Sequence, residues 1–333
     1  RHGMASDENA EPDRSKATAL RLCILTAFAD QICVRRDTGT LHCTLPHGRS
    51  GTLVRESVVQ QSPLLVVAEI RQISGRGSRA QTLLSLASAI ELDWVRKLFP
   101  DELTNRPECE FDPGPKRIET FEITRFRDLE LGRERARKPD AKAAGQALAR
   151  ACLRDWFKPK SFNHSIQMLI NRLNWLCAAR PDLEFPPLDE PAILNCLAAA
   201  FEGMTLAKQA VVADVKPAFR KHMPEAQWEW LDEFAPTTIA WPDDQPKRLQ
   251  YPEVPTDKHG NVNPVELNVK LHECFRLNEH PAICEGKHIV LFKLLTPKNK
   301  KIDFCDDWPT FKQRQYPRIR KDLLAKFPGV GWV

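Results

Sequence analysis

The spacing of apolar residues changes twice along this chain, and this change restricts the possible folds more than any other feature. Apolar side chains alternate through residues 31–53 and continue into the run "PLLVVAEIRQI", the pattern expected for short strands. From "NHSIQMLINRLNWLCAA" onward they recur every three or four residues, which predicts helices. Beyond residue 236, proline-rich segments and short apolar runs return. The order predicts an α+β protein.

The first of these regions indicates a small antiparallel β-barrel. Asp37, Thr38 and Gly39 suit a tight hairpin turn, and "QTLLSLASAI" can pair with the preceding strand across the glycine-rich "SGRGS" turn. A helix in "ATALRLCILTAFAD" precedes the strands, whereas "ELDWVRKLFPDEL" predicts a short helix and "RIETFEITRFRDLEL" a strand pair after them. We assign residues 17–132 to this barrel domain, and we expect the polar residues 1–16 to form a disordered leader.

Residues 133–235 are predicted to form a helical section. Asp189 is placed to cap a helix whose first turn holds Pro191 and whose end is marked by Gly203. Two further helices are expected in Leu206 to Lys221 and in Glu225 to Phe234. In the helix predicted for "NHSIQMLINRLNWLCAA", one apolar face contains Ile166, Leu169, Ile170, Leu173, Leu176 and Cys177.

Residues 236–333 are predicted to form an α+β domain that ends in a basic helix. The proline-rich start allows two short strands, "NPVELNVKLHECFRL" predicts an amphipathic helix, and "KHIVLFKLLTP" with "KKIDFC" predicts a strand pair. The terminal helix is expected from about Pro309 to Lys326, because Pro is tolerated in a first turn. Ile319, Leu323 and Phe327 follow each other at four-residue steps and should face the core.

Composition limits the class of protein and its compartment. A chain of 333 residues with 42% hydrophobic residues can bury more than one core, and a net charge of +5 permits a polyanionic partner. The ten cysteines contain no C-x-x-C pair and are expected to be reduced thiols. No apolar run reaches the length of a membrane helix, so we expect a cytoplasmic protein without a membrane partner. Position 1 is Arg, which is compatible with a chain that begins inside a longer protein.

An ordered series of segments resembles a known family. They are "AFADQICVRR", "SPLLVVAEI", "LDEFAPTTIAWP" followed by "KRLQY", "KLHECFRLNEHPAICEGKHIVLFKLLTP" and "YPRIRKDLLAKFP". Over most of Ala17 to Trp332 the chain is similar to the C-terminal half of HrpB-type ATP-dependent helicases, relatives of the DEAH-box RNA helicases. The resemblance implies an oligonucleotide-binding-type (OB-like) barrel packed on the helicase core, followed by a family-specific C-terminal extension. It also implies two RecA-like domains upstream, which would bind ATP and magnesium and act as a partner in cis.

The chain itself lacks the motifs of an ATPase motor. It contains no G-x-x-x-x-G-K-[ST] loop to hold a triphosphate and no D-E-x-H box, because neither "LDEP" nor "LDEF" is followed by His. The sequence contains no G-x-S-x-G nucleophile elbow, and none of its cysteines lies in the signature of a known cysteine-enzyme family. We therefore do not expect another type of enzyme. We therefore expect a non-catalytic portion of a helicase that needs no cofactor of its own, and its oligomeric state is left open.

Basic residues suggest where RNA or another single-stranded nucleic acid binds. Between Lys287 and Lys326 there are eleven Lys and Arg against four Asp, a local charge of 11 − 4 = +7. Such arrays bind phosphates by releasing counterions, although a solvated helix face or strand-edge protection has the same composition. His42 and His47 could stack on bases. The candidate contacts are Arg35, Arg36, Arg49, Arg76 and Arg79 in the barrel, and Lys298, Lys300, Lys301, Arg314, Arg318, Arg320, Lys321 and Lys326 near the C-terminus.

A metal site was considered for a group of His and Cys residues. His280, Cys284 and His288 recur at four-residue steps near His272 and Cys274, but Pro281 and Gly286 interrupt the helix that would align them, so we predict no metal.

The alternative function is a protein-interaction or scaffolding module that does not bind nucleic acid. It would be favoured if Trp228, Trp230 and Leu231 were exposed together, whereas buried side chains would make them part of the helical core.

Overall fold

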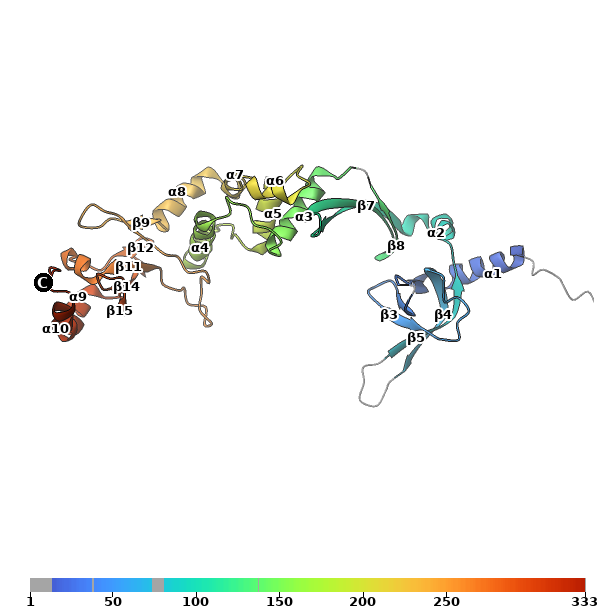
Figure 1. Ribbon diagram of the computed structural model, residues 1–333, viewed down its shortest axis with the longest axis horizontal. Coiled ribbons are helices and arrows are strands. Elements are labelled where there is room, and N and C mark those ends of the chain that lie inside the picture. The colour runs from blue at the N-terminus through green and yellow to red at the C-terminus, as the bar shows by residue number, and fades with distance from the viewer. Residues whose placement is uncertain (1–13, 38, 74–80, 137, 333) are drawn as a thin grey trace, which may run out of the picture. The chain divides into compact units, whose positions relative to one another are not determined.

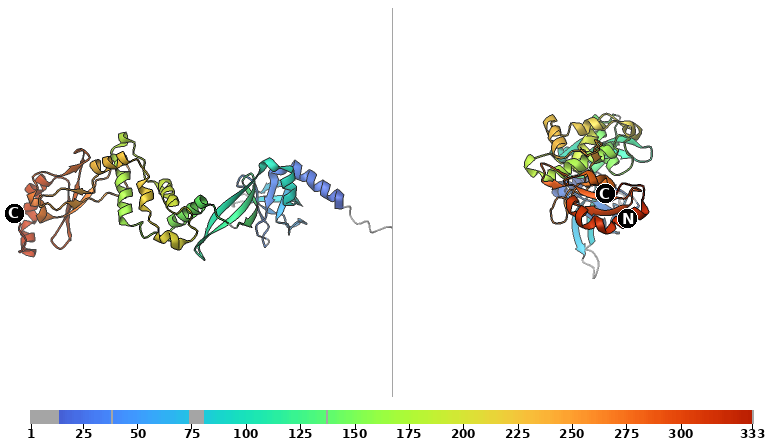
Figure 2. Two further views of the ribbon diagram at one scale, coloured as in Figure 1. Left: turned by 90° about the horizontal axis from the view of Figure 1, so that it is seen from above. Right: turned by 90° about the vertical axis from the view of Figure 1, so that its left-hand side faces the viewer.

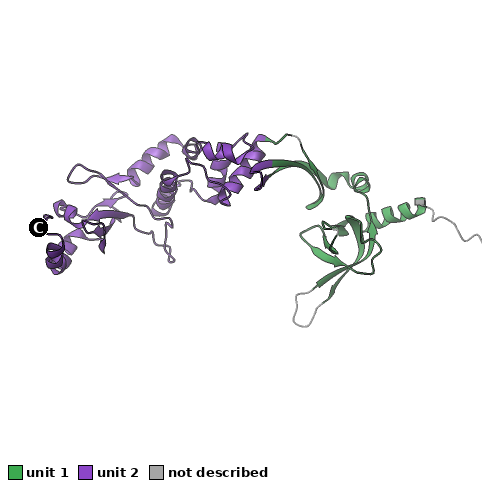
Figure 3. Ribbon diagram, viewed as in Figure 1, with its two compact units in different colours: residues 1–110, 119–140 green, residues 111–118, 141–333 purple. Residues whose placement is uncertain are grey.

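A computed structural model describes residues 14–37, 39–73, 81–136 and 138–332. The chain is α+β and divides into two compact units (Figure 1, Figure 3). Unit 1 comprises residues 1–110 and 119–140, and unit 2 comprises residues 111–118 and 141–333. Most of the segment predicted as a helical section, from residue 141 to residue 235, lies in unit 2 together with the predicted C-terminal α+β domain, whereas its first residues, 133–140, belong to unit 1.

Unit 1 contains a closed barrel with the strand order β1-β2-β3-β5-β4, in which β1 also pairs with β4. The small barrel predicted from the sequence is present, but it is not wholly antiparallel, because β3 and β5 pair in parallel through Thr52 with Leu83 and Leu53 with Leu84. The chain reverses direction twice between β3 and β5, so the two strands run the same way. The strands are β1 Ile32–Val34, β2 His42–Thr44, β3 Ser50–Leu53, β4 Leu64–Ile73 and β5 Gln81–Ala89.

Strand β4 is buried on both of its faces at its start. Leu65 and Val67 join the cluster inside the barrel, whereas Leu64 and Val66 join a second cluster outside it. Successive side chains of a strand point to opposite faces, so an uninterrupted apolar run is the expected sequence for this position. The second cluster also contains Leu25, from α1 Arg14–Ala27. Helix α1 begins inside the segment predicted as a leader, so residues 14–16 are helical, and residues 1–13 lie outside the described residues.

A short helix and a three-stranded sheet follow the barrel. Helix α2 Leu92–Leu98 and the predicted hairpin of β7 Arg117–Phe126 with β8 Leu129–Arg135 are present. The third strand, β6 Leu103–Asp112, was not predicted, because most of its side chains are polar and its sequence has no apolar alternation. Short 3₁₀ turns at Ala29–Gln31 and Pro100–Glu102 connect these elements.

The helices of unit 2 confirm most of the helical pattern. Asp189 caps α5 as predicted, since its Oδ1 accepts the N–H of Ala192 at 2.9 Å. The single helix predicted over residues 206–221 is in fact two, because Ser161 Oγ bonds to the backbone of Ala213 and Val215 at the break. No helix in the described part of the chain is both long and apolar enough to cross a membrane. The helices are α3 Ala141–Leu153, α4 His164–Ala179, α5 Glu190–Ala200, α6 Ala207–Val212, α7 Lys216–Arg220 and α8 Glu225–Phe234, with a 3₁₀ turn at Pro181–Leu183.

The strands of unit 2 correct one prediction. The segment predicted as an amphipathic helix forms β11 Glu266–Lys270, which is parallel to β14, and a 3₁₀ helix at Leu271–Arg276. Val265, Leu267 and Val269 are buried at alternate positions, which is the period of a strand and not that of the predicted helix. The predicted pair of β14 Leu291–Leu295 and β15 Lys301–Cys305 is confirmed. The remaining strands are β9 Thr238–Ile239, β10 Lys247–Arg248, β12 Ala282–Ile283 and β13 His288–Ile289.

A helical run from residue 308 to residue 326 ends unit 2, close to the predicted limits. It consists of α9 Trp308–Thr310, a π-helical turn at Phe311–Gln315, and α10 Tyr316–Lys326. In Figure 1 and in the left view of Figure 2 this red segment lies beside the orange strands of the same unit. Its buried side chains include Tyr316 and Leu323, whereas Ile319 and Phe327 are only partly buried.

Candidate nucleic-acid interface

One side of the terminal helical run is basic and exposed. Arg314, Arg318, Arg320, Lys321 and Lys326 all face solvent, while Tyr316 and Leu323 anchor the opposite side. Among the residues that the structure describes, no carboxylate forms a salt bridge with any of these five side chains. Their charges are therefore available to an anion.

A cavity of about 290 Å³ lies beside this helix. It is lined by Phe275, Lys312, Tyr316, Pro317 and Arg320. The ammonium nitrogen of Lys312 lies 5.8 Å from the ring centroid of Phe275, whose ring packs edge-on against Tyr316 at 4.8 Å. Two cations and an aromatic edge thus border one hollow. Phe275 was missed as a site residue, because its segment was predicted to be an amphipathic helix and is instead a 3₁₀ helix.

A second basic group lies on the turn between β14 and β15. Lys298 and Lys300 are exposed on this turn, and the ammonium nitrogen of Lys301 lies 3.6 Å from the ring centroid of Phe304. The Phe304 side chain is 41% exposed, and Lys293 is its cross-strand partner. Exposed aromatic rings beside cations are the usual platform for single-stranded nucleic acid. Phe304 was not among the predicted contacts, although an aromatic residue within a few positions of three lysines is a detectable signal.

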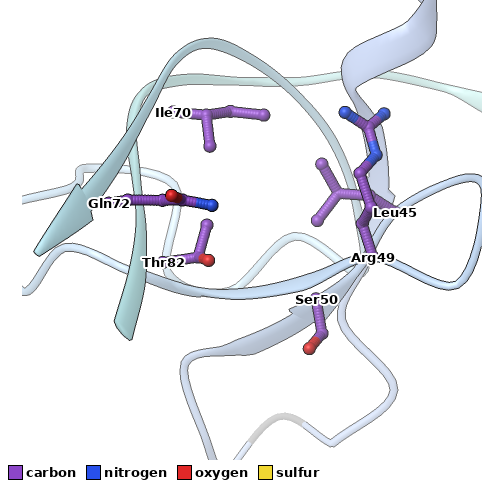
Figure 4. A pocket seen from close by; sticks show the side chains of 6 residues that line it. All are labelled: Leu45, Arg49, Ser50, Ile70, Gln72 and Thr82. Carbon is purple, nitrogen blue, oxygen red and sulfur yellow. The ribbon is translucent and has the colours of Figure 1, made fainter. Parts of the chain in front are cut away.

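The barrel also has a cavity of about 290 Å³, lined by both polar and apolar side chains. Figure 4 shows Gln72 and Thr82 on one side of it and Arg49 and Ser50 on the other. Arg49 is held in place because its guanidinium donates to the carbonyl oxygens of Asp30 at 2.6 Å and Pro46 at 3.1 Å. Leu45 and Ile70 complete the lining. The amide and hydroxyl groups opposite the guanidinium could bond to a phosphate or a base edge.

The other predicted barrel residues differ in their exposure. Arg36, His42 and His47 are exposed as expected. The N–H of His47 donates to both carboxylate oxygens of Asp128, at 2.8 and 2.9 Å, and this bond lowers the pKa of Asp128. Arg76 and Arg79 lie outside the described residues.

Arg35 is the exception, since it is only 2% exposed and not the surface arginine that was expected. Arg35 shares strand parity with Cys33, which faces the barrel interior, so its side chain follows the same inward direction. Its Nε and Nη2 atoms have no hydrogen-bond partner in the described part of the chain. A surface phosphate contact would need this side chain to move.

His280 and His288, which were considered as metal ligands, form hydrogen bonds or ring contacts within the fold. His280 bonds through both ring nitrogens, to the N–H of Trp308 at 2.9 Å and the carbonyl of Val290 at 2.6 Å. The ring of His288 packs edge-on against Trp175 at 5.1 Å. Within the described ranges, no group of three His, Cys, Asp or Glu side chains is arranged to hold a metal ion.

The aromatic cluster of α8 is divided between core and surface. Trp228 and Leu231 are buried, whereas Trp230 is 44% exposed. The three side chains therefore do not form the joint exposed patch that would have indicated a protein interface.

Known proteins with which the chain shares sequence similarity were identified for part and for most of its length. The family described as "ATP-dependent helicase C-terminal" (HrpB_C) matches residues 196–333. The ATP-dependent RNA helicase HrpB of Escherichia coli (strain K12) is 21% identical over 312 residues, covering 92% of this chain and 37% of that protein. The resemblance to the C-terminal region of HrpB-type helicases is confirmed.

Solved structures of HrpB share the fold. The crystal structure of the E. coli DExH-box NTPase HrpB has a TM-score of 0.68 at 19% identity, with 95% of this chain and 38% of that chain covered. A second crystal structure, of the Escherichia coli DEAH/RHA helicase HrpB, has a TM-score of 0.63 at 18% identity and the same coverage. The chain thus spans less than two fifths of the length of the HrpB proteins that it matches.

Proposed function

We propose that this chain contributes single-stranded RNA contacts to an ATP-dependent helicase of the HrpB type and packs against its ATPase motor. The observation that carries the proposal is the exposed basic side of α10, where Arg318, Arg320 and Lys321 have no carboxylate partner among the described residues. Phosphates release counterions when they bind such an array, and Arg adds paired hydrogen bonds to phosphate oxygens. The hollow between Lys312 and Arg320 supplies a place for one phosphate or base beside the helix.

The barrel is the second contact surface in this proposal. Its strand order and the closure of β1 on β4 support an OB-like barrel, a fold that binds oligonucleotides over strands 2 and 3 and the adjoining loops. The cavity with Arg49 and Ser50 lies at β3, and Gln72 and Thr82 reach it from β4 and β5. A strand of RNA over this face would meet both the fixed guanidinium and neutral donors.

ATP hydrolysis belongs to other domains in this proposal. The E. coli relative is named an ATP-dependent RNA helicase, but this chain matches 37% of its length and carries neither a triphosphate-binding loop nor a D-E-x-H box. ATP and magnesium would therefore bind RecA-like motor domains in cis. We infer a cytoplasmic location from the reduced cysteines and this helicase role.

Charge-matched variants of the full chain test the proposal. The triple variant Arg318→Ala, Arg320→Ala and Lys321→Ala should weaken binding of a fluorescent oligouridylate at low salt by about tenfold or more, since fewer counterions are released when fewer phosphates are neutralised. The control triple Lys216→Ala, Lys221→Ala and Lys258→Ala removes the same charge from exposed positions elsewhere in unit 2. Equal affinities of the two triples would refute the assignment of α10 as the contact surface.

A further inference from the structure

A groove of about 560 Å³ in unit 2 is not used by the proposed RNA contacts. Three segments build it: the turn before β7, the loop after α3, and helix α6. Main-chain hydrogen bonds join them, from Ala207 N–H to the Lys116 carbonyl at 3.0 Å and from Lys160 N–H to the Val211 carbonyl at 2.9 Å. The groove is therefore a preformed feature of the fold.

The walls of this groove are mainly aliphatic. Leu206, Val211 and Val212 line it, and Val212 is 70% exposed. Phe157 is fixed in the lining, because its ring packs 5.9 Å from that of Phe111 and 6.1 Å from that of Phe201. An apolar hollow of this volume lies within the range of about 300–1,000 Å³ that binding pockets occupy.

Three lysines surround the apolar wall. Lys116, Lys160 and Lys208 are all exposed and all line the groove. In the described part of the chain none of them pairs with a carboxylate. The backbone of Lys116 is left-handed, with a φ of +53°, a conformation that is uncommon for residues other than Gly. The groove thus combines apolar walls with unneutralised positive charge.

We propose that this groove docks an acidic segment of a partner polypeptide, with an aliphatic side chain in the hollow and flanking Asp or Glu residues on Lys116, Lys160 and Lys208. Charge complementarity selects the acidic partner, and the walls select the aliphatic anchor. RNA fits less well, since the ring of Phe157 is already packed between two other rings and no Arg in the lining offers a forked contact.

Selection of phage-displayed random dodecapeptides on the full chain at low salt tests this inference. The enriched peptides should carry Asp or Glu beside Leu, Ile, Val or Met, and the best of them is then synthesised for affinity measurements. The triple variant Lys116→Gln, Lys160→Gln and Lys208→Gln should weaken its binding by about tenfold, because exposed ion pairs contribute modestly and three are removed. Val212→Ser should weaken it independently, whereas the control Lys216→Gln, Lys221→Gln and Lys258→Gln should bind like the parent.

Several outcomes would overturn the docking proposal. They are the absence of enriched peptides, enrichment of peptides without acidic residues, and equal binding by the groove variant and the control. Displacement of the peptide by an oligouridylate would show that the groove is a nucleic-acid site instead. The test is independent of the α10 assignment, since the α10 triple variant should bind the peptide normally and the groove variant should bind RNA normally.

Discussion

The Nδ1 atom of His280 accepts the main-chain N–H of Trp308 at 2.9 Å. The other ring nitrogen donates to the carbonyl of Val290 at 2.6 Å, and the ring lies 4.3 Å from that of Phe292. One imidazole thereby ties the start of the terminal helical run to the segment that leads into β14. Only the neutral ring can do this, because a protonated Nδ1 cannot accept a hydrogen bond.

Acid should therefore loosen this connection. Burial lowers the pKa of His280, an effect that the hydrogen bond to Val290 and then Asp306 and Asp307 oppose more weakly, and burial also lowers the pKa of His272 and His288. Below about pH 6.5 the unfolded chain therefore binds more protons at these histidines than the folded chain does. Their contribution to the free energy of unfolding is complete above the unfolded pKa of about 6.5 and is lost as the pH falls below it. Urea unfolding at about pH 7.5 and about pH 5.5 measures this difference.

A variant assigns the effect to His280. His280→Phe should lower the free energy of unfolding at neutral pH by about 1–3 kcal/mol, because two backbone partners lose their bonds, and should reduce the loss of stability on acidification. His42→Gln, at an exposed position of the barrel, should behave like the parent. Equal stability of the parent at both pH values would contradict this account.

Arg172 should be needed for the stability of unit 2. Arg172 is only 7% exposed, and its guanidinium donates to the carbonyls of Leu231, at 3.0 Å, and Ala235, and to the Asp232 carboxylate at the end of α8. Arg172→Met leaves these acceptors without a donor and should cost about 2–4 kcal/mol in a denaturant titration. Arg150→Met, at an exposed position of α3, should change stability by less than about 0.5 kcal/mol.

Gly145 should not tolerate a methyl group, although Ala is normally the better helix residue. A Cβ at this position would lie 2.6 Å from the carbonyl oxygen of Ala198 and 3.1 Å from the amide nitrogen of Glu202. Gly145→Ala should force α3 and α5 apart and destabilise the protein by about 1–3 kcal/mol. Gly329→Ala, where a Cβ has no neighbour within 4 Å, is the control in thermal unfolding. A more stable Gly145→Ala protein would show that the two helices can separate without cost.

The purified chain should not hydrolyse ATP. No residues of the sequence match a triphosphate-binding loop or a D-E-x-H box, so nothing would hold the γ-phosphate and its magnesium ion. A phosphate-release assay with and without single-stranded RNA should give the rate of a buffer blank. RNA-stimulated hydrolysis that copurifies with the chain would overturn this prediction.

Local patterns were sufficient to predict much of the fold. The alternation around Cys43 and the run at Leu64 predicted the barrel, and the Asp189 cap and the face at Ile166 predicted helices that are present. The parallel pairing of β3 with β5 could not be predicted, because strands distant in sequence pair according to barrel closure and not according to local composition. The segment at Leu267 was assigned the wrong period, since its charged flanks fit a helix and a strand equally well.

The candidate site could be predicted only in part. Charge density identified the basic helix containing Arg318, whose side chain is exposed. It could not distinguish Arg36 from Arg35, because burial of the latter follows from its orientation in a closed barrel. Phe275 and Lys312 are far apart in the sequence and come close only in the folded chain. Local sequence spacing could therefore not predict that they line the same hollow.

The salt dependence of RNA binding tests the central claim most directly. The logarithm of the association constant should fall linearly with the logarithm of salt concentration for two RNAs of unrelated sequence, with similar slopes. The triple variant Arg318→Ala, Arg320→Ala and Lys321→Ala should reduce the steepness by up to about 0.7 for each phosphate that it no longer neutralises. Leu323→Ala, which truncates a buried side chain, should lower stability by about 2–5 kcal/mol without changing the slope of the folded molecules. If the parent and the triple variant have the same slope for both RNAs, the basic side of α10 is a solvated surface and does not bind RNA.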